Sequence, residues 1–249
     1  MNSSWRIGVD VGGTFTDFTL FEENKNYLLN YKAPSTPNEP AEAVENGLIY
    51  LIKKYDIDPL TINYLGHGTT VALNMLLEQR AKSIGLLTTK GFRDVLEIGR
   101  QTRPNLYNYE IKRPEPLAKR SHRIEIPERI NVDGIVQLPL DHGAVEQAAL
   151  DFLNNDIEAI AICFLHSYRN ANHEIQAAEI IRNTLPNAFL SLSSEVLPEF
   201  REYERTSTTA VNTYVGPRMQ LYLQKLKERI ARLGIKCSPS VSYTHLRAH

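Results

Sequence analysis

Apolar and polar residues alternate along the first part of the chain in the pattern of a β-hairpin. Every second residue before a glycine pair is apolar, at Ile7, Val9 and Val11. After the pair, most of residues 15–21 are aromatic, β-branched or apolar, which favours an extended strand over a helix. Gly12 and Gly13 lack Cβ atoms, so they permit positive φ and a tight reversal. The pattern therefore predicts two strands joined by a diglycine turn over residues 6–21.

The rest of the chain alternates between apolar runs of strand length and apolar positions at helical spacing. Helices are expected over residues 40–55, 71–80, 145–153, 174–184 and 205–234, the last broken near Gly216-Pro217. Strands are expected over residues 62–65, 84–88, 157–164 and 189–192. Asp133-Gly134 stands between two apolar runs and predicts a hairpin over residues 123–140. Strand and helix in turn predict an α/β fold, with a mixed sheet and helices outside it.

The same pattern suggests how the chain is divided. A boundary is expected between residues 187 and 198, because the sequence beyond it becomes almost wholly helical. Residues 100–119 are rich in proline and poor in apolar residues, so they predict a long loop of the kind that is often functional. The last twelve residues, 238–249, carry no periodicity and look like a non-native end. We therefore expect an α/β domain over 1–190, a mostly helical region over 191–236 and a tail over 237–249.

Composition and charge exclude several functions. The 249 residues carry a net charge of −1 with both signs mixed, which gives no electrostatic footprint for nucleic acid or an anionic membrane. No apolar run approaches a membrane span and the first residues lack the order of a signal peptide, so a cytoplasmic protein is expected. Cys163 and Cys237 suggest neither a metal site nor a disulfide framework. No metal is assigned to His166 or His173, which share no helix face with a carboxylate at metal spacing.

Short polar side chains surround the diglycine turn, at Asp10, Thr14, Thr16 and Asp17. A bare turn lets a phosphate approach backbone N–H groups, while a carboxylate can hold metal-bound water and hydroxyls can donate to phosphate oxygens. The sequence around it fits neither the GxxxxGKS/T loop nor the GxGxxG dinucleotide motif. An ordinary hairpin with a diglycine turn is the alternative. The acid before the turn and the Thr/Asp set after it favour a site for nucleotide phosphates and Mg²⁺.

A second candidate group is His67-Gly68-Thr69-Thr70, where a strand is expected to end in glycine and a helix to begin. The N–H groups and the helix dipole at such a junction can hold an anion or an acyl oxygen. His67 is then a candidate general base or hydrogen-bond donor. In the alternative interpretation, a threonine merely caps the helix and His67 is a structural histidine.

Arginines at the edge of the proline-rich loop form a third candidate group. Arg100 and Arg103 could bind a substrate carboxylate through bidentate hydrogen bonds, with Lys90 and Arg93 upstream. Solvated surface arginines are the commoner case. The dense charge run over residues 195–205 is interpreted as a solvated helix entry with i, i+4 pairs.

The motif VDVGGTFTD, residues 9–17, resembles the first phosphate motif of the superfold shared by actin, a heat-shock chaperone and sugar kinases. Its Phe-Thr-Asp ending resembles the hydantoinase A and 5-oxoprolinase family, whose relatives include a subunit of acetone and acetophenone carboxylases. Segments that agree with this family lie at residues 66–80, 85–108, 162–174 and 193–217. The resemblance implies an actin-like, ribonuclease H-like nucleotide-binding fold. It also implies an incomplete one, because the family chain normally continues for several hundred residues. The division then falls between a hydantoinase/oxoprolinase N-terminal domain over 1–190 and the start of a hydantoinase A domain over 191–236.

The activity that this resemblance implies is ATP-driven opening of a cyclic amide. Transfer of a phosphoryl group to the carbonyl oxygen of a lactam or hydantoin creates a leaving group that water can displace. In this scheme Asp10 holds Mg²⁺ through water, the Gly12 to Thr14 backbone and the Thr14 and Thr16 hydroxyls hold phosphate oxygens, and Asp17 steadies the turn or the metal shell. The expected partner is a hydantoinase B-type subunit or domain, and the present chain is expected to be inactive alone.

Two other functions stay open at this point. A small-molecule kinase of the same superfold also begins with a GVDVGGT-like motif, although no convincing acidic base is found for it. A nucleotide-binding subunit without chemistry of its own is the third possibility. Nor does the sequence choose among 5-oxoproline, hydantoin, N-methylhydantoin and ketone carboxylation as the substrate chemistry.

Overall fold

The computed structural model describes residues 4–36, 39–78, 82–101 and 114–242. The chain divides into two compact units, one formed by Met1–Arg80 with Arg218–His249 and the other by Ala81–Pro217. The chain thus leaves the first unit after residue 80 and returns to it at residue 218. This structural division does not coincide with the boundary expected between residues 187 and 198, which stays a prediction about where one homologous region ends and the next begins.

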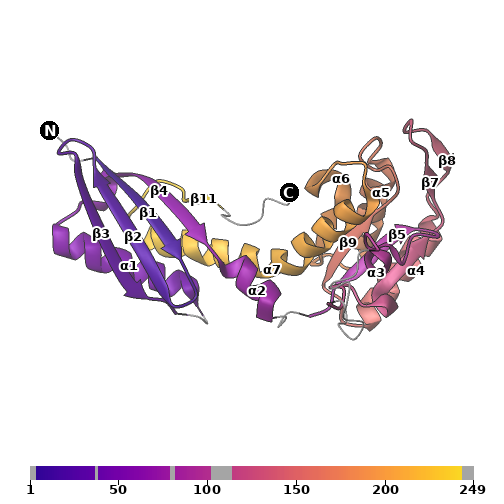
Figure 1. Cartoon of the computed structure of the whole chain (residues 1–249), viewed down its shortest axis with the longest axis horizontal. Helices are drawn as coiled ribbons and strands as arrows, with labels where there is room; N and C mark the ends of the chain where they lie inside the picture. The colour runs from indigo at the N-terminus through magenta and orange to yellow at the C-terminus, as the bar shows by residue number, and fades with distance from the viewer. Residues whose placement is uncertain (1–3, 37–38, 79–81, 102–113, 243–249) are drawn as a thin grey trace. The chain divides into compact units, whose positions relative to one another are not determined.

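The first unit is built on a five-stranded mixed sheet (Figure 1). Its strands are β1 (Trp5–Val11), β2 (Phe15–Glu22), β3 (Tyr27–Pro34), β4 (Ile62–Thr69) and β11 (Ser240–Ser242), in the order β11-β4-β1-β2-β3. The β1-β2 and β2-β3 pairs are antiparallel, whereas β4 runs parallel to β1 and β11 runs parallel to β4. The predicted hairpin over residues 6–21 is therefore present, and it forms the centre of the sheet.

Alternation along β1 and β2 separates the two faces of this sheet. Ile7, Val9, Val11, Phe18 and Leu20 are buried on one face. Helix α1 (Pro40–Tyr55) packs on β1, β2 and β3, and the α7 residues from Arg218 on contact β4 through Tyr222. At Gly47 a Cβ would lie 2.1 Å from the Phe18 ring, so glycine lets α1 approach the sheet closely. The opposite face carries Asp10 and Asp17, both exposed.

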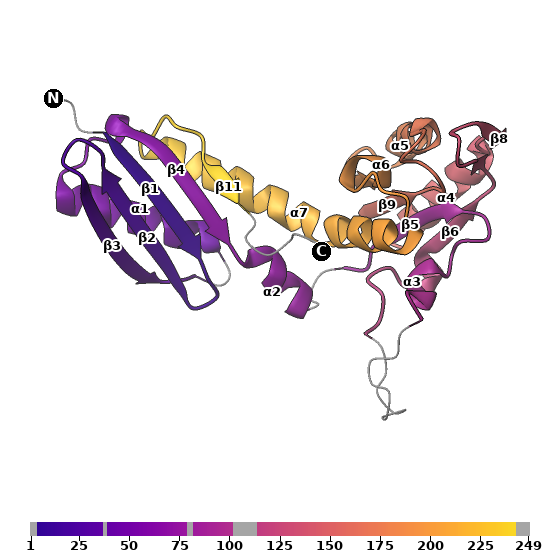
Figure 2. The same cartoon turned by 45° about the horizontal axis from the view of Figure 1, so that its top comes forward.

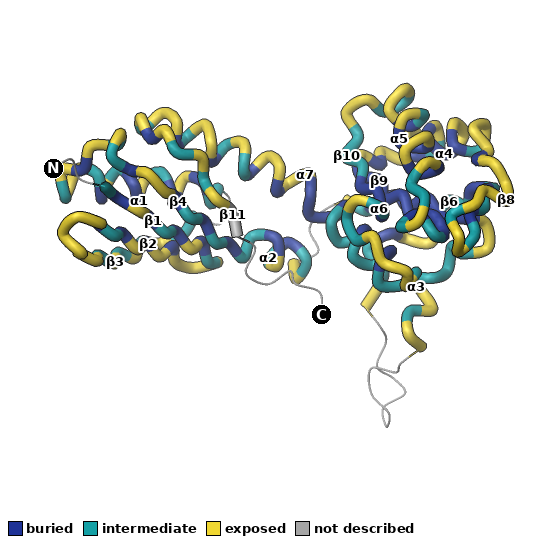
Figure 3. The backbone as a smooth tube through the Cα atoms, turned by 90° about the horizontal axis from the view of Figure 1, so that it is seen from above, coloured by how far each residue is buried: buried dark blue, intermediate teal, exposed yellow. Residues whose placement is uncertain are grey.

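The second unit contains a four-stranded sheet in which all strands are parallel. Its strands are β5 (Gly85–Thr89), β6 (Arg123–Ile126), β9 (Ala159–Cys163) and β10 (Phe189–Leu192), in the order β10-β9-β5-β6. Strands β5 and β9 are buried along their whole length, as continuous apolar runs in parallel sheets usually are. Figure 3 shows β9 as a buried, dark blue segment. Its core includes Phe152 of helix α4 (His142–Asn154) and Ile181 of helix α5 (Asn172–Thr184), packed against Ile160 and Ile162.

Short elements complete the two units (Figure 2). They are α2 (Val71–Glu78), α3 (Val95–Ile98), α6 (Ser193–Val196) and the 3-10 turns Pro59–Thr61 and Arg120–His122. The hairpin predicted over residues 123–140 is confirmed only in its inner part, where β7 (Arg129–Ile130) pairs with β8 (Val136–Leu138). The first apolar run instead forms β6 and joins the parallel sheet, because Pro127 separates it from β7.

The long helix α7 (Glu202–Arg232) runs through Gly216-Pro217 without interruption, so the predicted break is wrong. Proline lacks the N–H that would bond to the fourth preceding carbonyl, that of Thr213. Buried residues on both sides, Val215 before the proline and Met219 after it, hold both segments in helical conformation. Gly216 lets the helix pack closely against Phe189, because a Cβ at this position would lie 2.2 Å from the Phe189 ring. Tertiary packing therefore outweighs the local signal for a break.

Strand β11 was not expected in a tail without periodicity. Ser240, Val241 and Ser242 pair with Gly66, His67 and Gly68 of β4. Such a strand depends on backbone pairing along an existing edge, which leaves no apolar alternation in the sequence. The non-native origin assigned to residues 237–249 stays a prediction. Within the described residues, no helix is both long enough and apolar enough to cross a membrane.

Candidate functional site

The diglycine turn is closed by one short backbone hydrogen bond. The Gly12 N–H donates to the Phe15 carbonyl at 3.0 Å, and a Cβ on Gly12 would lie 3.0 Å from that same oxygen. Neither Gly12 nor Gly13 has a positive φ, so the expected left-handed conformation is not adopted. Glycine at position 12 is needed for close approach of the backbone and not for a special dihedral angle.

The two aspartates of the motif lie together on the open face of the sheet. Asp10 on β1 is directly opposite Asp17 on β2, and their side chains are exposed. Asp17 forms an ion pair with Lys32 at 3.2 Å, whereas Asp10 has no hydrogen bond or ion pair within the described residues. Gly68 of β4 pairs with Asp10, and a Cβ on Gly68 would lie 3.1 Å from Asp10 Oδ1. The open face therefore offers carboxylate oxygens beside a strand that carries no side chain at that point.

Thr16 lies on the other side of the hairpin and does not join these aspartates. It is fully buried, and its Oγ1 is 2.9 Å from Ser35 Oγ. The Ser35 hydroxyl donates to the Gly12 carbonyl at 2.8 Å, and the Ser35 N–H donates to the Thr14 carbonyl at 2.9 Å. Thr16 and Ser35 thus brace the turn from behind, while Thr14 is exposed at its tip. Strand alternation between residues 16 and 17 causes this separation.

The segment His67-Gly68-Thr69 is part of β4, which continues to Thr69, beyond the glycine where the strand was expected to end. His67 is 2% exposed, and its Nε2 lies 2.6 Å from the Tyr222 hydroxyl. Burial lowers the pKa of His67 to about 4, so the ring is neutral near pH 7. Burial likewise raises the pKa of Tyr222. His67 Nδ1 has no hydrogen-bond partner within the described residues. This geometry matches the structural interpretation of His67 and gives a general base no open access.

The two threonines after Gly68 act at the start of α2. Thr69 Oγ1 accepts a hydrogen bond from the Val71 N–H at 3.1 Å, which caps the helix. The Thr70 hydroxyl donates to the Val11 carbonyl at 3.3 Å, and the Thr70 N–H donates to the same oxygen at 3.1 Å. The threonines therefore join α2 to the end of β1, next to the diglycine turn.

The arginines proposed for a substrate carboxylate belong to the second unit. Arg100 is engaged in an ion pair with Glu204 of α7, and both side chains remain partly exposed. Arg93 lies 4.0 Å from Glu125. Arg103 lies outside the described residues. Within the second unit, the structure therefore places Arg100 in a local surface pair and not in a described pocket.

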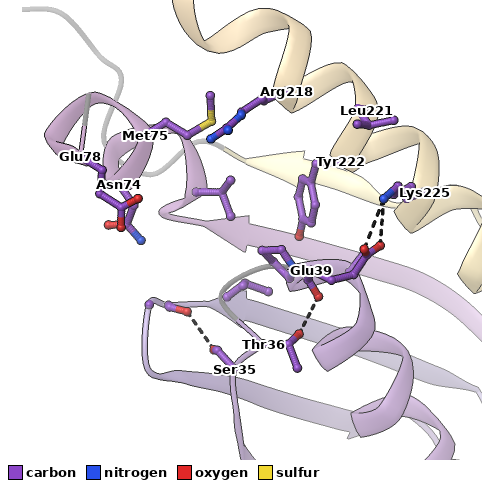
Figure 4. A pocket seen from close by; sticks show the side chains of 16 residues that line it. Ser35, Thr36, Glu39, Asn74, Met75, Glu78, Arg218, Leu221, Tyr222 and Lys225 are labelled. Carbon is purple, nitrogen blue, oxygen red and sulfur yellow. Dashed lines mark hydrogen bonds and ion pairs between the residues drawn. The ribbon is translucent and has the colours of Figure 1, made fainter. Parts of the chain in front are cut away.

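A cavity of about 420 Å³ lies behind the diglycine turn (Figure 4). Polar side chains on its wall include Ser35, Asn74, Arg218, Tyr222 and Lys225, none of which the sequence analysis singled out. Four of the α7 lining residues fall at helical spacing, at Arg218, Leu221, Tyr222 and Lys225. That spacing was visible in the sequence, but it was not used to predict a cavity.

One side of the cavity is held by ion pairs between α7 and the start of α1. Lys225 Nζ and Arg229 Nη2 each lie 3.2 Å from Glu39 Oε1. The hydrogen bond from Lys225, together with Arg229, lowers the pKa of the Glu39 carboxyl. Arg229 also pairs with Glu45. Glu39 and Lys225 are therefore largely neutralised by their neighbours.

The described residues contain no group of three or more His, Cys, Asp or Glu side chains that could hold a metal ion by themselves. Two carboxylates on an open face still suit Mg²⁺, which keeps several water ligands and is usually bound by one or two carboxylates together with phosphate oxygens. Asp10, with its unpaired carboxylate, fits this role better than Asp17, which is shared with Lys32.

The chain is thus a two-unit α/β protein whose central hairpin carries an exposed turn and two acids on the open face of a mixed sheet. Sequence comparison assigns such a chain to a family. The hydantoinase/oxoprolinase N-terminal region matches residues 6–185, and the chain therefore belongs to the hydantoinase/oxoprolinase family. The resemblance stated from the motifs is thus confirmed.

Individual relatives agree with this assignment. The chain is 39% identical over 236 residues to the caprolactamase subunit alpha of Pseudomonas jessenii, covering 92% of this chain and 34% of the relative. The crystal structure of ATP-dependent caprolactamase from that organism matches with a TM-score of 0.87 and 36% identity, over 95% of this chain and 35% of that one. A nucleotide-free acetone carboxylase structure shares the fold, with a TM-score of 0.86 at 24% identity over 96% of this chain and 36% of that one. The chain therefore spans about a third of the length of the caprolactamase subunit.

Proposed function

We propose that this chain is the N-terminal, phosphate-binding part of an ATP-dependent enzyme that opens cyclic amides. The observation that carries the proposal is the placement of Asp10 and Asp17 opposite each other on the open face of the β1-β2 hairpin, beside Gly68. Membership in the hydantoinase/oxoprolinase family and the similarity to an ATP-dependent caprolactamase support it. The fold class is that of actin and the sugar kinases, with a phosphate hairpin at the end of the first strand.

In this proposal each part of the hairpin has a distinct role. The backbone N–H groups of Gly13 and Thr14 donate to phosphate oxygens at the exposed tip, and the Thr14 hydroxyl adds a further donor. Asp10 holds Mg²⁺ through water, and Asp17 with Lys32 steadies the second strand. Thr16 does not touch phosphate but fixes the turn through Ser35. Bound Mg·ATP supplies the phosphoryl group that activates the otherwise unreactive amide carbonyl.

The rest of the enzyme lies outside this chain in the proposal. The second phosphate hairpin and the adenosine pocket belong to the remaining two thirds of the polypeptide, and a hydantoinase B-type subunit or domain works with it. The name of the relative, caprolactamase subunit alpha, favours a lactam as the substrate class. 5-Oxoproline and hydantoins are the other cyclic amides to be considered.

The test is an assay of ATP hydrolysis by the complete enzyme with a B-type subunit, in the presence of caprolactam, 5-oxoproline, hydantoin, acetone with bicarbonate, or a hexose. We expect ATP hydrolysis that depends on one cyclic amide and yields its ring-opened acid. Phosphorylated sugar as the product would establish a kinase instead, and ATP binding without any substrate-dependent turnover would establish a regulatory subunit. Either result would overturn the proposal.

A further inference from the structure

We propose that the cavity behind the diglycine turn is a second binding site, separate from the phosphate face, for a small molecule with one carboxylate and an apolar body. The cavity belongs wholly to the first unit, because each of its lining residues lies in Met1–Arg80 or Arg218–His249. Its volume of about 420 Å³ is within the range of small-molecule pockets, roughly 300–1,000 Å³.

The hairpin separates this cavity from the phosphate face. Val11 lines the cavity and is buried, whereas Asp10, its neighbour on β1, is exposed on the opposite face. Neither Asp10 nor Asp17 contributes to the cavity wall. Gly12 and Gly13 form the part of the hairpin that both places share. A ligand in the cavity would therefore lie on the far side of the turn from a metal held by Asp10.

Most polar groups of the cavity wall already have partners within the protein. Ser35 bonds to Gly12, the Thr36 hydroxyl donates to the Glu39 carbonyl, and Lys225 pairs with Glu39. The Tyr222 hydroxyl is occupied by His67 behind it. Glu78 also lines the cavity and has an interaction of its own. These groups shape the wall and leave little capacity to bind a ligand.

Two lining side chains have no partner in the described part of the chain, and both can donate hydrogen bonds. Arg218 projects from α7 with an exposed side chain and makes no hydrogen bond or ion pair there (Figure 4). Asn74 projects from α2, and its side-chain amide is likewise unpaired. A Cβ on Gly13 would lie 3.5 Å from Asn74 Nδ2, so the glycine keeps the space in front of this amide open. A ligand would supply the acceptors for these donors.

The chemistry of the wall selects among possible ligands. A guanidinium group binds a carboxylate through two parallel hydrogen bonds, and an amide can donate to a further oxygen. The apolar part of the wall comes from Val11, Ala41, Val71, Met75 and Leu221. These side chains suit a short hydrocarbon body next to the carboxylate. The apolar part of the wall offers no hydrogen-bond partners to the several charged oxygens of inorganic phosphate, so it favours a monocarboxylate with a hydrocarbon body over phosphate.

The test uses the 249-residue chain and titration calorimetry with three probes: hexanoate, hexanamide and inorganic phosphate. We expect hexanoate to bind with a Kd of about 1 mM or tighter, and hexanamide and phosphate to bind at least about tenfold more weakly. Arg218→Gln should weaken hexanoate binding at least about tenfold without changing the thermal midpoint, because Arg218 is exposed and unpaired. Lys227→Gln, which removes a positive charge from an exposed residue of the same helix without a partner in the described residues, is the matched control and should bind hexanoate as the unaltered chain does.

Asp10→Asn distinguishes this site from the proposed phosphate site. We expect it to leave hexanoate affinity unchanged, whatever its effect on ATP turnover in the complete enzyme. Loss of hexanoate binding in Asp10→Asn would show one shared site and overturn the proposal of a second one. Equal binding of hexanoate and hexanamide, preference for phosphate, or normal hexanoate binding by Arg218→Gln would overturn it as well.

Discussion

At the scale of single residues, burial decides which polar groups of the motifs can meet a ligand. Asp10 and Asp17 lie on one face because they pair directly across the tight hairpin, whereas the motif in the sequence only grouped them around the turn. Thr16 was grouped with the aspartates as a phosphate ligand, although the period of two along a strand already puts it on the face opposite to Asp17. The burial of His67 could not be predicted, because it depends on Tyr222, 155 positions away.

His67 should make the stability of the fold depend on pH. Its pKa is about 4 in the folded chain and ordinarily 6.5, so between these values the unfolded chain binds a proton that the folded chain does not. The free energy of unfolding therefore falls as the pH falls from 6.5 to 4, by about 3 kcal/mol from this group.

Urea denaturation across this pH range tests the prediction. His67→Gln should lose stability less steeply than the unaltered chain between pH 6.5 and 4, because the variant has no imidazole to protonate. His142→Gln, which changes an exposed histidine on α4, should follow the unaltered chain. Parallel curves for His67→Gln and the unaltered chain would show that His67 does not titrate as its burial requires.

At the scale of elements, the sequence predicted those whose periodicity is complete within one segment. Helix α1 begins at Pro40 as expected, and the buried strands β5 and β9 follow their apolar runs. Errors arose where a neighbouring element decides the outcome. Strand β4 continues past Gly68 because β1 pairs with it as far as Thr69. Helix α7 continues past Pro217 because buried residues hold the segments before and after the proline in place.

The Gly216-Pro217 pair in α7 gives opposite predictions for two neighbouring substitutions. Pro217→Ala should raise the free energy of unfolding by about 1–3 kcal/mol, because alanine restores an intrahelical donor in an exposed position. Gly216→Ala should lower it, because the new Cβ would lie 2.2 Å from the Phe189 ring. Chemical denaturation measures both changes. A destabilising Pro217→Ala would mean that α7 needs the proline, and a neutral Gly216→Ala would mean that α7 does not pack on Phe189 as described.

At the scale of the whole molecule, two units come from three stretches of sequence. No local pattern predicts that residues 218–232 belong to the first unit, because they continue a helix that begins in the second unit. The cavity escaped prediction for this reason: its wall combines the hairpin, the start of α1, α2 and α7. The β1-β2 hairpin, by contrast, is contained in fifteen consecutive residues, 7–21, and its outline could be predicted from the sequence.

The tail provides a prediction about the limits of the fold. Deleting residues 238–249 removes the three-residue strand β11, whose pairing is offset by an ordering cost of about 1–2 kcal/mol per residue. We expect the thermal midpoint to fall by less than about 2–4 °C, the shift that 1 kcal/mol produces in a chain of this size. A larger loss, measured by differential scanning calorimetry, would show that the tail is an integral part of the native sheet.

The central claim is that Asp10 holds the metal of Mg·ATP on the open face of the hairpin. Its most direct test is Asp10→Asn in the complete enzyme, with substrate-dependent ATP hydrolysis and the thermal midpoint measured together. Asp156→Asn is the matched control, since Asp156 is exposed in the second unit with φ +54°, a conformation that asparagine tolerates. We expect Asp10→Asn to lower the turnover at least about 10²-fold. Its thermal midpoint should equal that of Asp156→Asn. Normal ATP hydrolysis by Asp10→Asn would contradict the account.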